Sequence, residues 1–311
     1  MINWLDKMYM FGPKRVQIEV TNRCNLNCTM CPRSFLNLPQ EDMKYNIFLQ
    51  ILSKLKDVKK IWLTGWGEPF LHPNIIEMAK DIIKSGIKAG VTTNGILPEN
   101  IRLEDLLIFD EIMFSIESIN AGCQYGHKDT RSINTIIKVL KLRNGIKKPI
   151  IGIQSVFGGN NQNHILELIR WSKGIGADFL KIIPINIFHQ DRLKQPDADV
   201  TKDFFKKALK LGSNIKFRVD IPNIAMGDGI LRVVYKIGIK FLIFFNLHCL
   251  KLLDYLYVTL DGKISPCCEL PRYIVGDLMK NDIKSIWTGA VLNNFRIHQK
   301  EICKKCSLAL N

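Results

Sequence analysis

Short apolar runs that alternate with amphipathic segments are the feature that most limits the folds open to this chain. Six runs rich in β-branched residues occupy residues 16–21, 60–65, 89–94, 111–117, 150–156 and 179–185. Residues 74–85, 132–143, 164–174 and 201–211 place apolar side chains at three- and four-residue spacing, which is typical of amphipathic helices. Strand–helix repeats favour a parallel sheet with right-handed crossovers. The sequence therefore predicts an α/β fold, a partial (β/α)6 TIM-like barrel that binds ligands at the carboxyl ends of its strands.

Composition and charge indicate a folded protein with anionic partners. A chain of 311 residues that is 47% hydrophobic buries a sizeable core, which excludes disorder as its main state. Lys and Arg outnumber Asp and Glu by 44 to 29, and the resulting net charge of +15 favours anionic partners. Nucleic acid is not expected, because no RNA-binding module is recognisable.

Targeting signals are absent from the sequence. It shows neither a signal peptide nor a run of about 18 uncharged apolar residues, so we expect a cytoplasmic protein. Residues 230–245 combine basic and apolar side chains, which leaves peripheral contact with an anionic membrane open. A buried helix that links two parts of the chain is the favoured interpretation of this segment.

Eight of the nine cysteines fall into two groups. Thiols stay reduced in the cytosol, so these cysteines are expected to bind metal rather than form disulfides. Cys24, Cys28 and Cys31 follow the first predicted strand, and one short loop can direct three thiolates to one point. Three thiolates on a cluster of four irons leave one iron open to a substrate or cofactor. A zinc knuckle or buried free cysteines are the alternatives.

The Cys-x3-Cys-x2-Cys spacing resembles the signature of the radical S-adenosylmethionine (SAM) superfamily, and the resemblance covers residues 14–190. Residues 64–73 are similar to the family's Gly-Gly-Glu-Pro element, with Trp66 where glycine is commoner. The family's pattern also has Asp at the position of Glu117, and related proteins often carry a Tyr and an Arg where Tyr125 and Arg131 stand. The resemblance implies a [4Fe-4S] cluster that binds SAM, and a SAM site formed by Gly65, Gly67, Glu68, Pro69, Thr93, Asn94, Ser115 and Glu117.

The second cysteine group lies near the C-terminus, at Cys249, Cys267, Cys268, Cys303 and Cys306. Asp-Gly between residues 255–260 and 263–265 is a hairpin signal that returns the chain towards the first of these cysteines. The group resembles the SPASM domain or its shortened twitch form, as do residues 276–278, 285–287 and 295–296. The resemblance implies one auxiliary [4Fe-4S] cluster on Cys249, Cys267, Cys303 and Cys306.

Three points about the cysteines stay open at this stage. Spacing does not show whether Cys267 or its neighbour Cys268 is the ligand of the auxiliary site. Four thiolates also suit tetrahedral zinc, so the spacing does not distinguish zinc from an iron–sulfur cluster. Cys123 is expected to be an unliganded residue near the mouth of the barrel.

The expected domains are an N-terminal extension (1–13), the barrel (14–215), a linker (216–248) and a β-hairpin and helix domain for the auxiliary cluster (249–311).

The resemblance also implies the chemistry. The enzyme would cleave SAM reductively to methionine and a 5′-deoxyadenosyl radical, which abstracts a substrate hydrogen. The auxiliary cluster would accept an electron, giving a dehydrogenated or crosslinked product from a small anionic metabolite, with flavodoxin or ferredoxin as the electron donor. A peptide or cofactor-precursor maturase is the alternative within the superfamily, and a non-catalytic iron–sulfur carrier or zinc scaffold is the alternative outside it. The sequence identifies no catalytic base.

Overall fold

The computed structural model describes residues 12–33, 39–119, 130–186, 196–221 and 249–306. Cys123, Tyr125 and the segment at residues 230–245 lie outside these ranges, so the expectations about them stay predictions.

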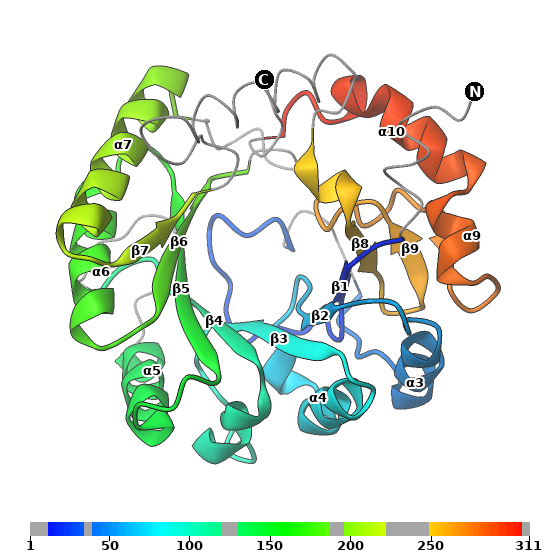
Figure 1. Ribbon diagram of the computed structural model, residues 1–311, viewed down its shortest axis with the longest axis horizontal. Coiled ribbons are helices and arrows are strands. Elements are labelled where there is room, and N and C mark those ends of the chain that lie inside the picture. Colours follow the sequence, from blue (N-terminus) through cyan, green and yellow to red (C-terminus); the bar gives the residue numbers. More distant parts are fainter. Residues whose placement is uncertain (1–11, 34–38, 120–129, 187–195, 222–248, 307–311) are drawn as a thin grey trace.

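One continuous sheet organises the molecule (Figure 1). Its strands are β1 (Arg15–Ile18), β2 (Lys60–Leu63), β3 (Lys88–Thr93), β4 (Glu111–Ser115), β5 (Ile150–Phe157), β6 (Phe179–Pro184), β7 (Arg218–Asp220), β8 (Tyr255–Val258), β9 (Lys263–Ser265) and β10 (Gly276–Asp277). They are ordered β10-β9-β8-β1-β2-β3-β4-β5-β6-β7. Neighbours from β8 through β1 to β7 are parallel, whereas β9 and β10 continue the sheet antiparallel. The sheet curves around an interior without closing, which confirms the partial barrel.

Helices cover the outside of this sheet. They are α3 (Tyr45–Ser53), α4 (Ile75–Lys84), α5 (Thr130–Arg143), α6 (Gln162–Gly174) and α7 (Ala198–Asn214), with the short helices η1 (Pro69–Leu71) and η2 (Leu103–Ile108). The four predicted helical segments correspond to α4, α5, α6 and α7. No helix in the described ranges is long and apolar enough to cross a membrane.

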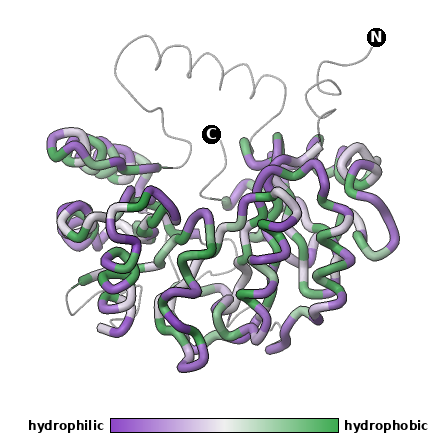
Figure 2. Tube along the Cα trace, turned by 60° about the horizontal axis from the view of Figure 1, so that its bottom comes forward, coloured by the Kyte–Doolittle hydropathy of each residue, from purple (hydrophilic) through white to green (hydrophobic). Residues whose placement is uncertain are grey.

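Hydropathy is mixed along the trace, as Figure 2 shows, and on β1 and β6 buried residues alternate with less buried ones. Val16 and Ile18 are buried in the core, whereas Gln17 between them bonds to groups on neighbouring strands. The same period of two on β6 buries Leu180 and Ile182 and turns Lys181 to the opposite face. Polar groups therefore line the interior of the barrel.

The C-terminal region follows the barrel in the chain and also contributes strands to the barrel's sheet. The predicted hairpin is present as β8 and β9, and β8 pairs in parallel with β1, from Arg15 opposite Tyr255 to Ile18 opposite Val258. The remaining elements are η3 (Leu250–Leu253), α9 (Ile283–Trp287) and α10 (Ala290–Ile302). Cys267 follows β9 and the N-terminal cysteine loop follows β1, so both lie at strands of the same sheet, whereas Cys303 and Cys306 follow α10.

Candidate functional site

The loop with Cys24, Cys28 and Cys31 leaves the carboxyl end of β1 and is held against the turn after β2. The Arg23 guanidinium donates to both carboxylate oxygens of Asp42, at 3.0 and 2.6 Å, and to the carbonyl oxygen of Leu71 at 2.6 Å. The backbone N–H of Glu68 donates to the carbonyl oxygen of Arg23 at 2.8 Å. These bonds join the cysteine loop to the Gly-Trp-Gly-Glu-Pro turn.

The same loop is joined to the end of β3. The side-chain amide of Asn25 donates to the carbonyl oxygen of Ile96, and that of Asn94 donates to Asn25 Oδ1, both at 2.8 Å. The ends of three adjacent parallel strands therefore meet around the cysteine loop, where this fold binds ligands.

Both glycines of the turn stand where the backbone has no room for a side chain. A Cβ at Gly67 would collide with the carbonyl oxygens of Thr21 and Arg23. A Cβ at Gly65 would collide with the side chain of Glu19, whose Oε1 accepts a hydrogen bond from the Trp66 N–H at 3.1 Å. The turn therefore needs glycine at both positions, and the intervening Trp66 is compatible with it.

Glu68 connects this turn with β3. Its carboxylate accepts hydrogen bonds from Thr93 Oγ1 at 2.8 Å, from the Asn94 N–H at 2.7 Å and from the Phe70 N–H at 3.2 Å. Burial raises the pKa of Glu68 to about 7, against the lowering effect of these three donors. A carboxylate offers about four acceptor positions, so one more donor, such as an ammonium group, can be accommodated.

Glu117 follows β4 and reaches the neighbouring strand. Its Oε2 accepts from the Val156 N–H at 2.7 Å and from Ser155 Oγ at 3.1 Å, both on β5. Burial raises the pKa of Glu117 to about 7, and the two donors oppose this shift. Ser115 is the last residue of β4 and is half-buried, so the two predicted residues lie at the carboxyl end of one strand.

The three thiols of the loop are close enough to influence one another. Burial, followed by the charges of Cys31 and Cys24, raises the pKa of Cys28 to about 11. Burial also raises the pKa of Cys24 and of Cys31. Metal binding by these residues must therefore displace the thiol protons.

The C-terminal cysteines surround a second site. One cavity is lined by Cys249, Cys267, Cys303 and Cys306, together with Lys251, Leu252, Pro266, Glu269, Leu270 and Phe295. Burial and the charges of Cys306 and Cys249 raise the pKa of Cys303 to about 12. Four predicted ligands thus share one cavity although they are up to 57 positions apart in the chain.

Cys268 has different neighbours from Cys267. It is absent from the residues that line the cavity, and its Sγ accepts a hydrogen bond from Lys251 Nζ at 3.9 Å. Burial lowers the pKa of Lys251, but Cys268, Cys267, Glu269 and Cys249 raise it more, so the net shift is upward. The structure therefore distinguishes the two adjacent cysteines, which spacing could not rank.

The helices α9 and α10 support the cysteine pair at the C-terminus. Arg296 on α10 donates to the carbonyl oxygen of Trp287 at 2.8 Å and to Asn293 Oδ1 at 2.7 Å, and its guanidinium lies 4.3 Å from the Trp287 ring centroid. Cys303 follows α10 directly, and its N–H donates to the carbonyl oxygen of Gln299 at 2.8 Å. The contact between α9 and α10 thereby fixes the start of the Cys303–Cys306 turn.

Hydrogen bonds link β8, which precedes the C-terminal hairpin turn, with β1 and with the residue after β2. Tyr255 on β8 donates to Gln17 Oε1 at 2.7 Å, and Gln17 Nε2 donates to the carbonyl oxygen of Thr64 at 2.9 Å. Thr64 is the residue before the Gly-Trp-Gly-Glu-Pro turn. Gln17 and Tyr255 were not among the predicted site residues, although the polar Gln17 between Val16 and Ile18 is a signal of an inward position.

Comparison with protein families agrees with this geometry. Residues 18–172 match the radical SAM superfamily, and residues 249–307 match SPASM, an iron–sulfur cluster-binding domain. The chain is a radical SAM enzyme with a SPASM domain. Its cofactors are accordingly a [4Fe-4S] cluster that binds SAM in the first domain and auxiliary iron–sulfur clusters in the second.

Curated relatives are similar in sequence to this radical SAM enzyme over most of its length. The tungsten-containing aldehyde ferredoxin oxidoreductase cofactor-modifying protein of Pyrococcus furiosus is 26% identical over 95% of this chain and 87% of its own length. The GTP 3′,8-cyclase of Aquifex aeolicus is 30% identical over 62% of this chain and 64% of its own length. Both relatives are named for the modification of a small molecule or cofactor.

Solved structures share the fold at low sequence identity. Streptococcus suis SuiB bound to the precursor peptide SuiA has a TM-score of 0.73 at 17% identity, over 98% of this chain and 72% of that one. Native anSMEcpe with bound AdoMet has a TM-score of 0.65 at 16% identity, over 90% of this chain and 82% of that one. These likenesses establish the architecture of the radical SAM and SPASM domains.

The residues of both sites suit the cofactors of this family. Thiolates are the usual protein ligands of iron–sulfur clusters, and every described cysteine is free of disulfides. Within the described ranges, no three His, Cys, Asp or Glu side chains converge closely enough to bind a single metal ion. A four-iron cluster, in contrast, takes each thiolate on a different iron. Glu68 retains room for one donor beside Cys24, as the amino group of SAM requires.

Proposed function

We propose that this enzyme uses SAM to generate a 5′-deoxyadenosyl radical that abstracts a hydrogen atom from a substrate in the barrel, and that the substrate radical is then oxidised. The observation that carries the proposal is that one sheet contains both β1, which leads into the first cysteine loop, and the hairpin β8–β9, which leads to Cys267. When bound, the clusters supply electron transfer. The protein supplies positioning and shelter from water.

The proposed reaction balances in one-electron steps. One electron from a reduced flavodoxin or ferredoxin cleaves SAM to methionine and the 5′-deoxyadenosyl radical, and transfer of a hydrogen atom to this radical gives 5′-deoxyadenosine and a substrate radical. Loss of one electron to the auxiliary cluster and of one proton to water then gives a dehydrogenated or crosslinked product. We propose Cys24, Cys28 and Cys31 as ligands of the first cluster. Because they share the second cavity, we propose Cys249, Cys267, Cys303 and Cys306 as ligands of the other.

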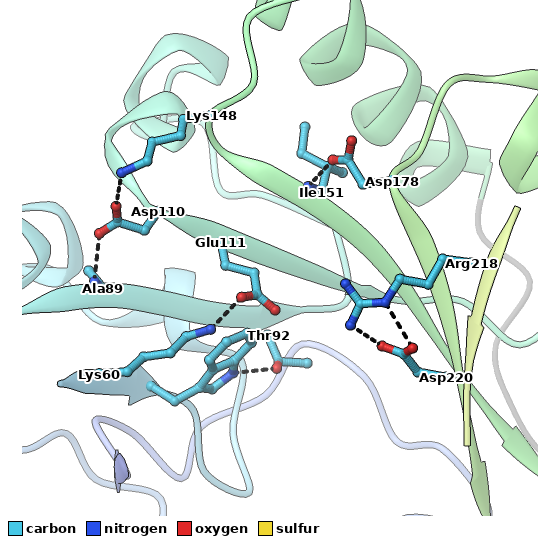
Figure 3. Close-up of polar contacts among 11 residues, drawn as sticks. Lys60, Ala89, Thr92, Asp110, Glu111, Lys148, Ile151, Asp178, Arg218 and Asp220 are labelled. Atoms are coloured by element: carbon cyan, nitrogen blue, oxygen red, sulfur yellow. Dashed lines mark hydrogen bonds and ion pairs between the residues drawn. The ribbon is translucent and has the colours of Figure 1, made fainter. Parts of the chain in front are cut away.

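The inner face of the barrel favours a small anionic substrate. Lys60 is paired with Glu111 and Arg218 with Asp220, as Figure 3 shows. Lys181, in contrast, has no ion pair within the described residues, and burial and the charge of Lys251 lower its pKa. Asp220 and Cys268 favour the charged form of Lys181 but do not outweigh its burial, and an anionic group of the substrate would relieve the remaining cost.

The anionic substrate is tested by ligand-induced stabilisation. Carboxylated and phosphorylated metabolites are added to the reconstituted enzyme with SAM, and the melting temperature is compared with that of Lys181→Met. Binding ligands are expected to raise the melting temperature of the parent protein and to have a smaller effect on the variant. Equal stabilisation of both proteins, or a preference for neutral analogues, would contradict the role of Lys181.

A cofactor-precursor or peptide maturase is the second candidate. It is favoured by the Pyrococcus furiosus cofactor-modifying protein, whose similarity runs along 95% of this chain. Under this proposal the anionic group belongs to a larger precursor, and a gene product or cofactor intermediate would co-purify with the enzyme.

The radical reaction itself is tested under anaerobic, reducing conditions. We expect 5′-deoxyadenosine from the parent enzyme, none from Cys28→Ala, and continued formation by Cys306→Ala. Iron and acid-labile sulfide should be about eight per chain in the parent and about four in each variant. A parent protein that holds zinc, or that forms no 5′-deoxyadenosine with both clusters loaded, would overturn the proposed function.

A further inference from the structure

Lys251 lies inside the cavity formed by the C-terminal cysteines. It belongs to η3, which begins directly after Cys249, and it lines the same cavity as the four proposed ligands. Its Nζ donates to Cys268 Sγ at 3.9 Å and lies 5.4 Å from the ring centroid of Tyr255. Lys251 thus lines the cavity and also lies beside Tyr255 on β8, a strand of the main sheet.

The surroundings of Lys251 contain more negative than positive groups. Lys251 interacts electrostatically with Cys268, Cys267, Glu269 and Cys249. Its own charge contributes to lowering the pKa of Lys181. No ion pair between Lys251 and a carboxylate occurs in the part of the chain that the structure describes. The charge of Lys251 is therefore directed mainly at sulfur.

We propose that Lys251 is a positioning residue that makes the auxiliary cluster easier to reduce. The inference rests on the proposed function, in that the C-terminal thiolates hold a [4Fe-4S] cluster. Four thiolates give such a cluster a net negative charge, which grows by one unit when it accepts an electron. A fixed positive charge in a buried site favours the more negative state, so its presence shifts the midpoint potential upward.

This charge has a consequence for the direction of electron flow. A higher midpoint potential makes the auxiliary cluster a better acceptor for the electron of the substrate radical. Lys251, which contacts Cys268 and Tyr255, would thereby help to draw that electron into the auxiliary cluster.

The test measures a potential, which a merely structural role would not move. A Cys24→Ser, Cys28→Ser, Cys31→Ser background leaves only the auxiliary cluster, and its reduction is followed by EPR in an anaerobic redox titration. In this background, Lys251→Met is expected to lower the reduction equilibrium constant at least tenfold, a downward shift of about 59 mV for one electron. Lys251→Arg keeps the charge and should shift the potential less.

The matched control is Lys280→Met, because Lys280 is in the same domain and its side chain is 81% exposed. It should leave the potential unchanged. Equal potentials in Lys251→Met and the parent, both with about four irons per chain, would overturn the inference. Loss of iron from both Lys251→Met and a second variant, Lys251→Gln, would also overturn it, because Lys251 would then be needed for assembly. Zinc in the parent would instead refute the proposed function itself.

Discussion

At the scale of single residues, the glycine at position 67 makes the sharpest steric prediction. Gly67→Ala places a Cβ against two backbone carbonyl oxygens of the cysteine loop, which cannot move as a flexible side chain would. We expect a loss of about 1–3 kcal/mol in the free energy of unfolding and a strong loss of 5′-deoxyadenosine formation. Denaturant unfolding and the anaerobic SAM-cleavage assay measure these effects.

Gly174→Ala is the control for that substitution, because no atom lies within 4 Å of the added Cβ and the position ends α6. It should be neutral or slightly stabilising. Equal behaviour of the two variants would show that the close approach at Gly67 is not required.

Glu117 predicts how stability depends on pH. Burial raises its pKa from 4.5 to about 7, so the folded state holds the proton more tightly than the unfolded state. The resulting stabilisation is present below about pH 4.5 and is lost as pH rises through about 7, a change of about 3 kcal/mol. Glu117→Gln should remove this part of the slope when the free energy of unfolding of the apoprotein is measured between pH 5 and 8.

The exposed Glu104→Gln serves as the comparison and should keep the parent slope. If the free energy of unfolding changed with pH in the same way for Glu117→Gln and for the parent protein, Glu117 would be ionised over the whole range. The hydrogen bonds from Ser155 and Val156 would then lower its pKa more than burial raises it.

The adjacent cysteines illustrate what sequence alone could not decide at this scale. Spacing predicts a thiolate site but cannot separate Cys267 from Cys268, because the direction of each side chain depends on the turn after β9. Ser265 Oγ, which lies 3.0 Å from the carbonyl oxygen of Cys267, helps to fix that turn. Likewise, the motif predicts Glu68 at the site but not that Thr93 and Asn94 are its donors.

At the scale of elements, the contact between α9 and α10 predicts a selective loss of the auxiliary cluster. Arg296 is buried against Trp287, and Arg296→Met removes the hydrogen bonds to Trp287 and Asn293 while keeping the packing volume. The start of the Cys303–Cys306 turn should then lose its support. Iron per chain should fall from about eight towards about four, while 5′-deoxyadenosine formation continues.

Ile297→Ala, next to it on α10, is the control, since Ile297 is 61% exposed. Its iron content should equal that of the parent. If Arg296→Met kept both clusters, the position of Cys303 would not depend on the stacked guanidinium.

The elements also show why part of the fold was predictable. Strong local patterns gave β1 to β6 and α4 to α7 close to their observed bounds. β7 was missed because it has three residues, too few for a periodic signal. The hairpin β8–β9 was predicted, but its parallel pairing with β1 was not, because that contact joins residues about 240 positions apart and depends on the tertiary fold.

At the scale of the whole molecule, the net charge of +15 predicts how the enzyme receives electrons. Loading of two clusters lowers this charge only to about +12, because the seven thiolates bring slightly more negative charge than the cluster cores offset. Attraction between this surface and an anionic donor protein, such as a flavodoxin or ferredoxin, would speed their encounter. The second-order rate constant for reduction by the donor should therefore fall as ionic strength rises from about 0.05 to 0.3 M, a range in which the screening length shortens below about 10 Å.

Stopped-flow mixing of the reduced donor with the oxidised enzyme measures this rate constant under anaerobic conditions. The first-order rate at saturating donor is the internal control, because it follows the encounter and should depend much less on salt. Encounter rates that stay constant or increase with salt would show that the positive charge does not face the donor. The excess of basic residues would then have to serve the substrate inside the barrel, where Lys181 lies, rather than the partner outside it.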